Sequence, residues 1–136
     1  MDSEQVTLEF LLKPAPVPFI YKADLVRVID GDTIDVTIDL GFSISMLARV
    51  RLKGVDTPEI FGPNAGPAGK QAQAFVTVWC SACTGLLLQS LKWEREKYGR
   101  VLGDFFRVRS DGTTDPISLA QALREAGLQK MNKAFA

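Results

Sequence analysis

Residues 34–40 read Ile-Asp-Val-Thr-Ile-Asp-Leu, a strict alternation of apolar and polar side chains. A period of two predicts a β-strand with one buried face and one solvated face. A second alternating run follows at residues 46–55, and residues 19–29 are rich in Ile, Tyr, Leu and Val. Turn signals at Asp30-Gly31-Asp32 and Gly41-Phe42-Ser43 separate the runs, and we expect the glycine of the first turn to adopt a positive φ. The sequence therefore predicts three consecutive strands joined by turns.

Helical patterns alternate with two further strands in the second half of the chain. Apolar residues at spacings of three and four from Ala68 to Cys83 predict an amphipathic helix. Residues 85–93 and 99–109 are strand-like, and Ser118 with Gln121 forms a capping-box pattern before a second helix that Gly127 would end. A helix between the third and fourth strands of a five-stranded barrel is the plan of an OB-fold. We therefore expect an α+β OB-fold barrel with a second helix after strand five, although other small barrels also have five strands.

Length and composition indicate one globular domain. The chain has 136 residues, of which 46% are hydrophobic and 24% charged. Pro14, Pro16 and Pro18 predict an extended lead-in over residues 1–18, followed by a single domain over residues 19–136. The net charge is zero, which argues against a globally basic surface that coats nucleic acid. Residues 1–40 nevertheless hold eight acidic and three basic side chains, so a local acidic pocket beside basic elements is compatible with the neutral total.

The N-terminus, Met1-Asp2-Ser3-Glu4, is acidic and lacks the basic start and apolar run of a signal peptide. We therefore expect a cytoplasmic location, with a mature or trimmed chain as the alternative.

Cys80 and Cys83 form a Cys-x-x-Cys sequence that resembles a redox motif. Reactive dithiols lie at helix N-termini, where the helix dipole stabilises the thiolate, whereas this pair ends a helical pattern. Without histidine, the chain also has too few ligands for a tetrahedral zinc site. We expect both thiols to pack as small apolar groups, and a dithiol redox protein is the less favoured alternative.

Three polar runs contain the residues suited to chemistry. Asp32 and Asp56 follow turns at strand ends and can share one divalent cation, and an all-oxygen site favours Ca²⁺ or Mg²⁺ over zinc. Glu59 can deprotonate a water molecule. Arg51 and Arg100 can hold phosphate oxygens and stabilise a five-coordinate transition state. Taken singly, each has a structural explanation, as a turn former, a strand cap, a loop glutamate or a surface arginine.

Taken together, the runs resemble the staphylococcal nuclease (thermonuclease) family. The resemblance rests on Ile29-Asp30-Gly31-Asp32-Thr33, then Arg51 to Val55 with Asp56-Thr57-Pro58-Glu59, then Lys97-Tyr98-Gly99-Arg100, in family order and at family-like separations. Ala126-Gly127-Leu128 also resembles a later family segment. The match extends over about residues 19–132.

The resemblance implies an OB-fold nuclease that uses Ca²⁺ to hydrolyse DNA and RNA and leaves 3′-phosphate ends. By position, Asp32, Asp56 and the Thr57 carbonyl would bind calcium, and Glu59 would activate water. Arg51 and Arg100 would bind phosphate. Asp30 and Thr33 would support the metal ligands, and Lys97 and Tyr98 would flank the substrate.

The family continues with stacking tyrosines and a third helix, where residues 131–136 offer only Phe135 as a stacking residue. We expect a monomer that acts on single-stranded or frayed DNA and RNA. Because free Ca²⁺ is scarce in a cytoplasm, such an enzyme suits a phage- or plasmid-borne role. The alternative is an OB-fold nucleic-acid-binding module with weak or no catalysis, although such modules typically lose the acidic and arginine positions.

Overall fold

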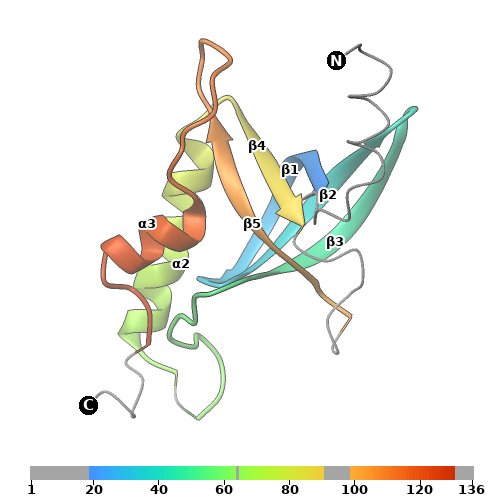
Figure 1. Ribbon diagram of the computed structural model, residues 1–136. Helices are drawn as coiled ribbons and strands as arrows, with labels where there is room; N and C mark the ends of the chain where they lie inside the picture. Colours follow the sequence, from blue (N-terminus) through green and yellow to red (C-terminus); the bar gives the residue numbers. More distant parts are fainter. Residues whose placement is uncertain (1–18, 64, 91–98, 131–136) are drawn as a thin grey trace, which may run out of the picture.

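Five β-strands close into a barrel in the order β1-β2-β3-β5-β4 (Figure 1). The computed structural model describes residues 19–63, 65–90 and 99–130. The strands are β1 (Phe19–Asp30), β2 (Thr33–Gly41), β3 (Ile44–Leu52), β4 (Gly85–Ser90) and β5 (Val101–Val108). Helix α2 (Pro67–Ser81) lies between β3 and β4, and helix α3 (Leu119–Glu125) follows β5. The predicted five-stranded OB-fold with its two helices is confirmed.

One strand pair sets the topology of the barrel. β3 and β5 are parallel, with Val50 opposite Val101, whereas the other four neighbouring pairs are antiparallel. A parallel pair needs a long crossover connection, which here contains α2 and β4. Both helices lie on one side of the barrel, and the β2–β3 hairpin projects on the other side (Figure 1). The end of β3 is thereby placed beside the start of β5.

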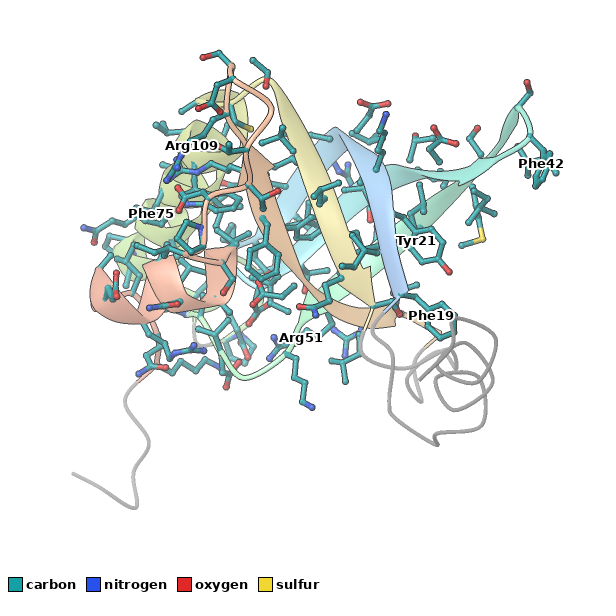
Figure 2. All side chains as sticks on the ribbon, turned by 45° about the horizontal axis from the view of Figure 1, so that its top comes forward. Phe19, Tyr21, Phe42, Arg51, Phe75 and Arg109 are labelled. Carbon is teal, nitrogen blue, oxygen red and sulfur yellow. The ribbon has the colours of Figure 1, made fainter. Side chains whose placement is uncertain are left out.

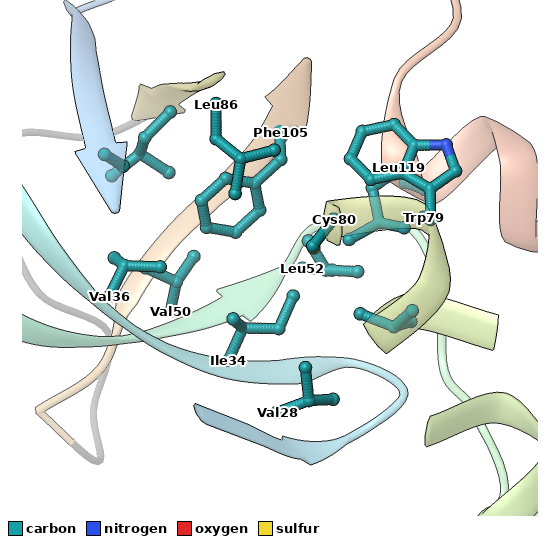
Figure 3. Packing of buried hydrophobic residues seen from close by; sticks show 14 of the residues in the cluster. Val28, Ile34, Val36, Val50, Leu52, Trp79, Cys80, Leu86, Phe105 and Leu119 are labelled. Atoms are coloured by element: carbon teal, nitrogen blue, oxygen red, sulfur yellow. The ribbon is translucent and has the colours of Figure 1, made fainter. Parts of the chain in front are cut away.

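The alternating run in β2 supplies the centre of the core. Ile34 and Val36 are fully buried, and they pack with Val50 of β3 and Phe105 of β5 (Figure 3). Asp35, between them, faces outward and accepts a hydrogen bond of 2.8 Å from Arg49 Nε across the hairpin. The period of two therefore identified the buried face correctly for Ile34, Val36 and Ile38, whereas Leu40, close to the hairpin turn, is 41% exposed.

Helix α2 covers one end of the core with the face predicted from its spacing. Val76 and Trp79 are buried, and the Arg107 guanidinium lies 4.6 Å from the Trp79 ring centroid. Cys80 is buried and Cys83 half-buried, and both thiols are free. Burial, with the nearby Cys83, raises the pKa of Cys80 to about 12. This argues against the dithiol redox alternative, because the thiolate is the reactive form.

Helix α3 has 7 residues, against 15 in α2, and it is capped at both ends. The Ser118 hydroxyl accepts a hydrogen bond of 3.2 Å from the Gln121 N–H, as predicted. The Gln121 side chain also donates a bond of 3.2 Å from its Nε2 to Glu125 Oε1, one turn later. Gly127 has φ of +72°, and the Leu128 N–H donates to the Leu123 carbonyl, which ends the helix as expected.

The turn predicted at Gly31 is present, but the positive φ expected for this glycine is not. Gly31 does not adopt a positive φ. A Cβ atom at this position would lie 2.7 Å from Thr57 Oγ1 and 2.8 Å from Ala72 Cβ, closer than real contacts allow. The turn therefore needs glycine because α2 and the segment after β3 pack directly against its backbone.

The part of the chain that the structure describes contains no helix long and apolar enough to cross a membrane. The expected lead-in over residues 1–18 and Phe135 lie outside the described residues.

Candidate functional site

The candidate site forms where the β1–β2 turn meets the segment that leaves β3. The Asp32 carbonyl accepts a hydrogen bond of 2.9 Å from the Leu52 N–H, which holds the two segments side by side. The Asp32 carboxylate adds a second link, because its Oδ2 accepts a bond of 2.9 Å from the Thr57 N–H. Residues separated by 25 positions are thus held together by one aspartate.

Asp32 is buried, at 7% exposure, yet its carboxylate is held in the charged form. Burial opposes the charge, but hydrogen bonds from Asp30 and the Thr57 N–H, with the nearby Arg51, outweigh it and lower the pKa of Asp32. The Thr33 hydroxyl donates a further bond of 3.1 Å to Oδ1. An anionic, oriented carboxylate is what a cation ligand requires.

Asp30 differs from Asp32 although it lies two residues away. Burial, together with the hydrogen bond and charge of Asp32, raises the pKa of Asp30 to about 6. Asp30 Oδ1 also accepts a bond of 3.3 Å from the Asp32 N–H. Asp30 therefore supports the turn that presents Asp32, which is compatible with the supporting position expected for it and Thr33.

Arg51 bridges the two aspartates expected to bind metal. Its Nη2 lies 3.3 Å from Asp56 Oδ1 and 3.5 Å from Asp32 Oδ2. Its Nη1 donates bonds of 2.7 Å to the carbonyls of Leu52 and Val55. The guanidinium thus anchors the chain that leaves β3. Figure 2 shows Arg51 far from Phe42, which marks the tip of the β2–β3 hairpin.

Thr57 is 2% exposed and fixed mainly by packing. Its side chain lies against the backbone of Gly31, and its Oγ1 has no hydrogen-bond partner among the described residues. Its N–H is used by Asp32. This packing fixes the peptide that carries the Thr57 carbonyl, the group expected to bind calcium.

Glu59 lies on the rim of the site and is held from two sides. Its carboxylate Oε1 lies 3.2 Å from Lys130 Nζ, and the hydrogen bond, with the nearby charge of Asp56, raises the pKa of Lys130. On its other side, the Glu59 backbone packs against Gly69 of α2 so closely that a Cβ there would lie 2.6 Å from the Glu59 carbonyl carbon. The side chain remains 43% exposed.

Arg100 lies directly before β5 and is half-buried. Its neighbour Val101 is paired with Val50, so Arg100 approaches the same end of the barrel as Arg51. Lys97 and Tyr98, which were expected to flank the substrate, lie outside the described residues.

A calcium ion fits the donors that the site contains. Among the described residues, no three carboxylate or thiol side chains are grouped as a metal site. A cation here would therefore use the carboxylates of Asp32 and Asp56, with carbonyl and water oxygens as the remaining ligands. The contact of one Arg51 nitrogen atom with both carboxylates shows that they face a common point and can share a positive charge. All-oxygen ligation of this kind suits Ca²⁺ or Mg²⁺.

Lys130, Gly69 and Arg124 were not identified from the sequence as parts of this site. Lys130 is 71 residues from Glu59, and Arg124 donates a bond of 3.1 Å to the carbonyl of Gly54, 70 residues away. No local pattern marks either contact. Gly127 predicts that the helix ends and the chain turns, but it does not predict which residues the following segment contacts.

Comparison with known proteins places the chain near nucleases. It is 39% identical over 80 residues to a thermonuclease of Staphylococcus hyicus, a match that covers 57% of this chain and 44% of that protein. It is 41% identical over 78 residues to the thermonuclease of Staphylococcus intermedius, covering 56% of this chain and 43% of that protein. A micrococcal nuclease of Shigella flexneri is 34% identical over 83 residues, which cover 61% of this chain and 41% of that protein.

No protein-family model matches the chain. The matches to the curated relatives span less than half of the length of each relative. Together with the five-stranded barrel, they confirm that this chain is related in sequence to thermonucleases over more than half of its length.

Proposed function

We propose that this protein is a calcium-dependent nuclease that hydrolyses phosphodiester bonds of DNA and RNA and leaves 3′-phosphate ends. The observation that carries the proposal is the convergence of Asp32, Asp56 and Arg51 at one end of the barrel, with Glu59 on the rim. The similarity to thermonucleases supports the same reaction class.

The side chains and backbone of this protein supply the metal ligands, the general base and the arginines that this reaction needs. Asp32, Asp56 and the Thr57 carbonyl would hold the calcium ion, which when bound acts as a Lewis acid on the phosphate. Glu59 takes a proton from the attacking water, whose oxygen forms a bond to phosphorus as the bond to the 5′ oxygen breaks, and the departing 5′ oxygen takes a proton from solvent and leaves as a hydroxyl. The phosphate then remains on the 3′ oxygen of the other fragment.

Arginines near the site stabilise the negative charge that develops on the phosphate oxygens in the transition state. Arg51 already faces two carboxylates, so a phosphate would share or replace these contacts through the same guanidinium. Arg100 is the second candidate, directly before the neighbouring strand β5. A planar guanidinium can bind two phosphate oxygens at once, and such bonds strengthen as negative charge increases.

Cleavage of plasmid DNA and of RNA with calcium, and with a chelator instead, tests the proposal, and end-group analysis identifies the 3′-phosphate. Glu59→Gln and Arg100→Ala should each lower kcat by about 10²-fold or more, because each removes a group needed in the transition state.

Matched controls are Glu125→Gln on α3 and Arg109→Ala after β5, which make the same substitutions in exposed residues of the same type. Both controls should cleave like the original protein. Near-normal activity of Glu59→Gln and Arg100→Ala would contradict the mechanism. Nucleic-acid binding without any calcium-dependent cleavage would instead favour the alternative, a non-catalytic OB-fold binding module.

A further inference from the structure

Lys130 is fastened to the candidate site through both its backbone and its side chain. Its N–H donates a hydrogen bond of 2.6 Å to the Asp56 carbonyl. Its Nζ lies 3.2 Å from Glu59 Oε1 and 4.0 Å from Asp56 Oδ2. One residue therefore contacts the expected base, and both the backbone and the carboxylate of an expected metal ligand.

The segment that carries Lys130 is itself well anchored. Gly127 turns the chain at the end of α3, and Leu128 packs against the hydrophobic core. Arg124, at the end of the same helix, donates to the Gly54 carbonyl. The segment after α3 is therefore held beside residues 54–59 by backbone and side-chain contacts, and it carries the Lys130 ammonium.

The positive charge of Lys130 also affects the binding of a cation at the site. With Arg51 on one side and Lys130 on the other, the two acidic groups Asp56 and Glu59 are partly compensated by protein cations. A divalent cation that binds Asp56 would meet the ammonium as a like charge. At this partly exposed position, such a repulsion changes ion affinity by about threefold to tenfold after screening by salt.

We propose that Lys130 is a positioning residue for Glu59 that also weakens calcium binding at Asp56. This inference rests on the proposed nuclease function. Its two consequences have opposite signs: the ammonium helps the reaction by orienting the base, and it opposes the cation by its charge. A residue with a purely structural role would not produce that combination, because disturbing the fold lowers both activity and ion affinity.

Lys130→Met tests this directly, because it keeps the aliphatic stem and the backbone N–H to Asp56 and removes only the ammonium. By titration calorimetry, calcium should bind about threefold to tenfold more tightly than to the original protein. In steady-state cleavage, kcat should fall by about tenfold, with KM changed by less than about threefold, because the base loses its orientation. Lys130→Arg should restore both values toward those of the original protein.

Two further variants complete the design. Lys22→Met removes the same charge from an exposed position on β1, at the end of that strand remote from Asp30, and should change neither value. In a Glu59→Gln background, Lys130→Met should cause no additional loss of kcat, because the lysine acts through Glu59.

Unchanged calcium affinity, unchanged kcat, a loss of both, or a full effect in the Glu59→Gln background would each overturn the inference. An original protein that shows no calcium-dependent cleavage would refute the proposed function instead. The two failures are distinguishable, because the first is read from the variants of an active enzyme.

Discussion

Gly69→Ala offers a sharp test of how the fold positions the candidate base. Gly69 is buried in the first turn of α2, and its Cα faces the backbone of Glu59 and Ile60. An added Cβ would lie 2.6 Å from the Glu59 carbonyl carbon and 3.0 Å from the Ile60 nitrogen. Ordinary contact begins at 3.4 Å, so relief of the carbonyl-carbon contact alone needs a movement of 0.8 Å, the difference between 3.4 and 2.6 Å, and the Glu59 carbonyl oxygen, which is closer still, requires more.

The same substitution has opposing effects on stability. Alanine is more favourable than glycine in a helix by about 1 kcal/mol. Overpacking typically costs about 1–3 kcal/mol. The free energy of unfolding should therefore fall by no more than about 2 kcal/mol, and the protein should remain folded. A displacement of this size at a catalytic group lowers the rate by up to about 10²-fold, so activity should suffer far more than stability.

The measurements are kcat for calcium-dependent cleavage and the free energy of unfolding from guanidinium titration. Gly66→Ala is the matched control, because a Cβ at Gly66 meets nothing within 4 Å and its φ of −165° is extended backbone that any residue adopts. The control should keep its activity. A folded Gly69→Ala variant with kcat within threefold of the original protein would refute the idea that α2 sets the position of Glu59.

Two further predictions concern stability. Phe105→Ala should lower the free energy of unfolding by about 3–5 kcal/mol, because this fully buried ring fills the barrel, whereas Phe42→Ala at 99% exposure should change it by less than about 0.5 kcal/mol; denaturant titration checks both. Hydrogen bonds from the Ile117 N–H and Arg107 lower the pKa of Asp115. The ionised Asp115 carboxylate therefore stabilises the folded state at a pH above the unfolded-state pKa of about 4. This stabilisation is lost as the pH falls through the lower, folded-state pKa. The thermal midpoint should therefore decrease more between pH 7 and pH 3 in the original protein than in Asp115→Asn. Equal decreases in the two proteins would contradict this assignment.

Local patterns in the sequence determined the secondary structure and the order of the elements. The alternation at residues 34–40 depends only on the two-residue period of a strand, so it predicted the buried face of Ile34, Val36 and Ile38, while the exposure of Leu40 depends on where the strand leaves the barrel. Ser118 and Gly127 marked the ends of α3 because caps are satisfied within a few residues. The three polar runs likewise indicated which side chains to expect at one site, and the structure brings Asp32, Arg51, Asp56 and Thr57 into contact.

Tertiary structure alone decided how these groups are supported. Gly31 is required by the close approach of Thr57 and Ala72, and not by its own φ, a distinction that no turn pattern contains. The bridge from Arg51 to both aspartates depends on the angle at which the chain leaves β3. The Lys130 contact depends on where a chain reversal after α3 ends, 71 residues from Glu59. Periodicity and capping act over a few residues, whereas these contacts follow from closing the barrel and packing both helices on it, which places distant segments side by side.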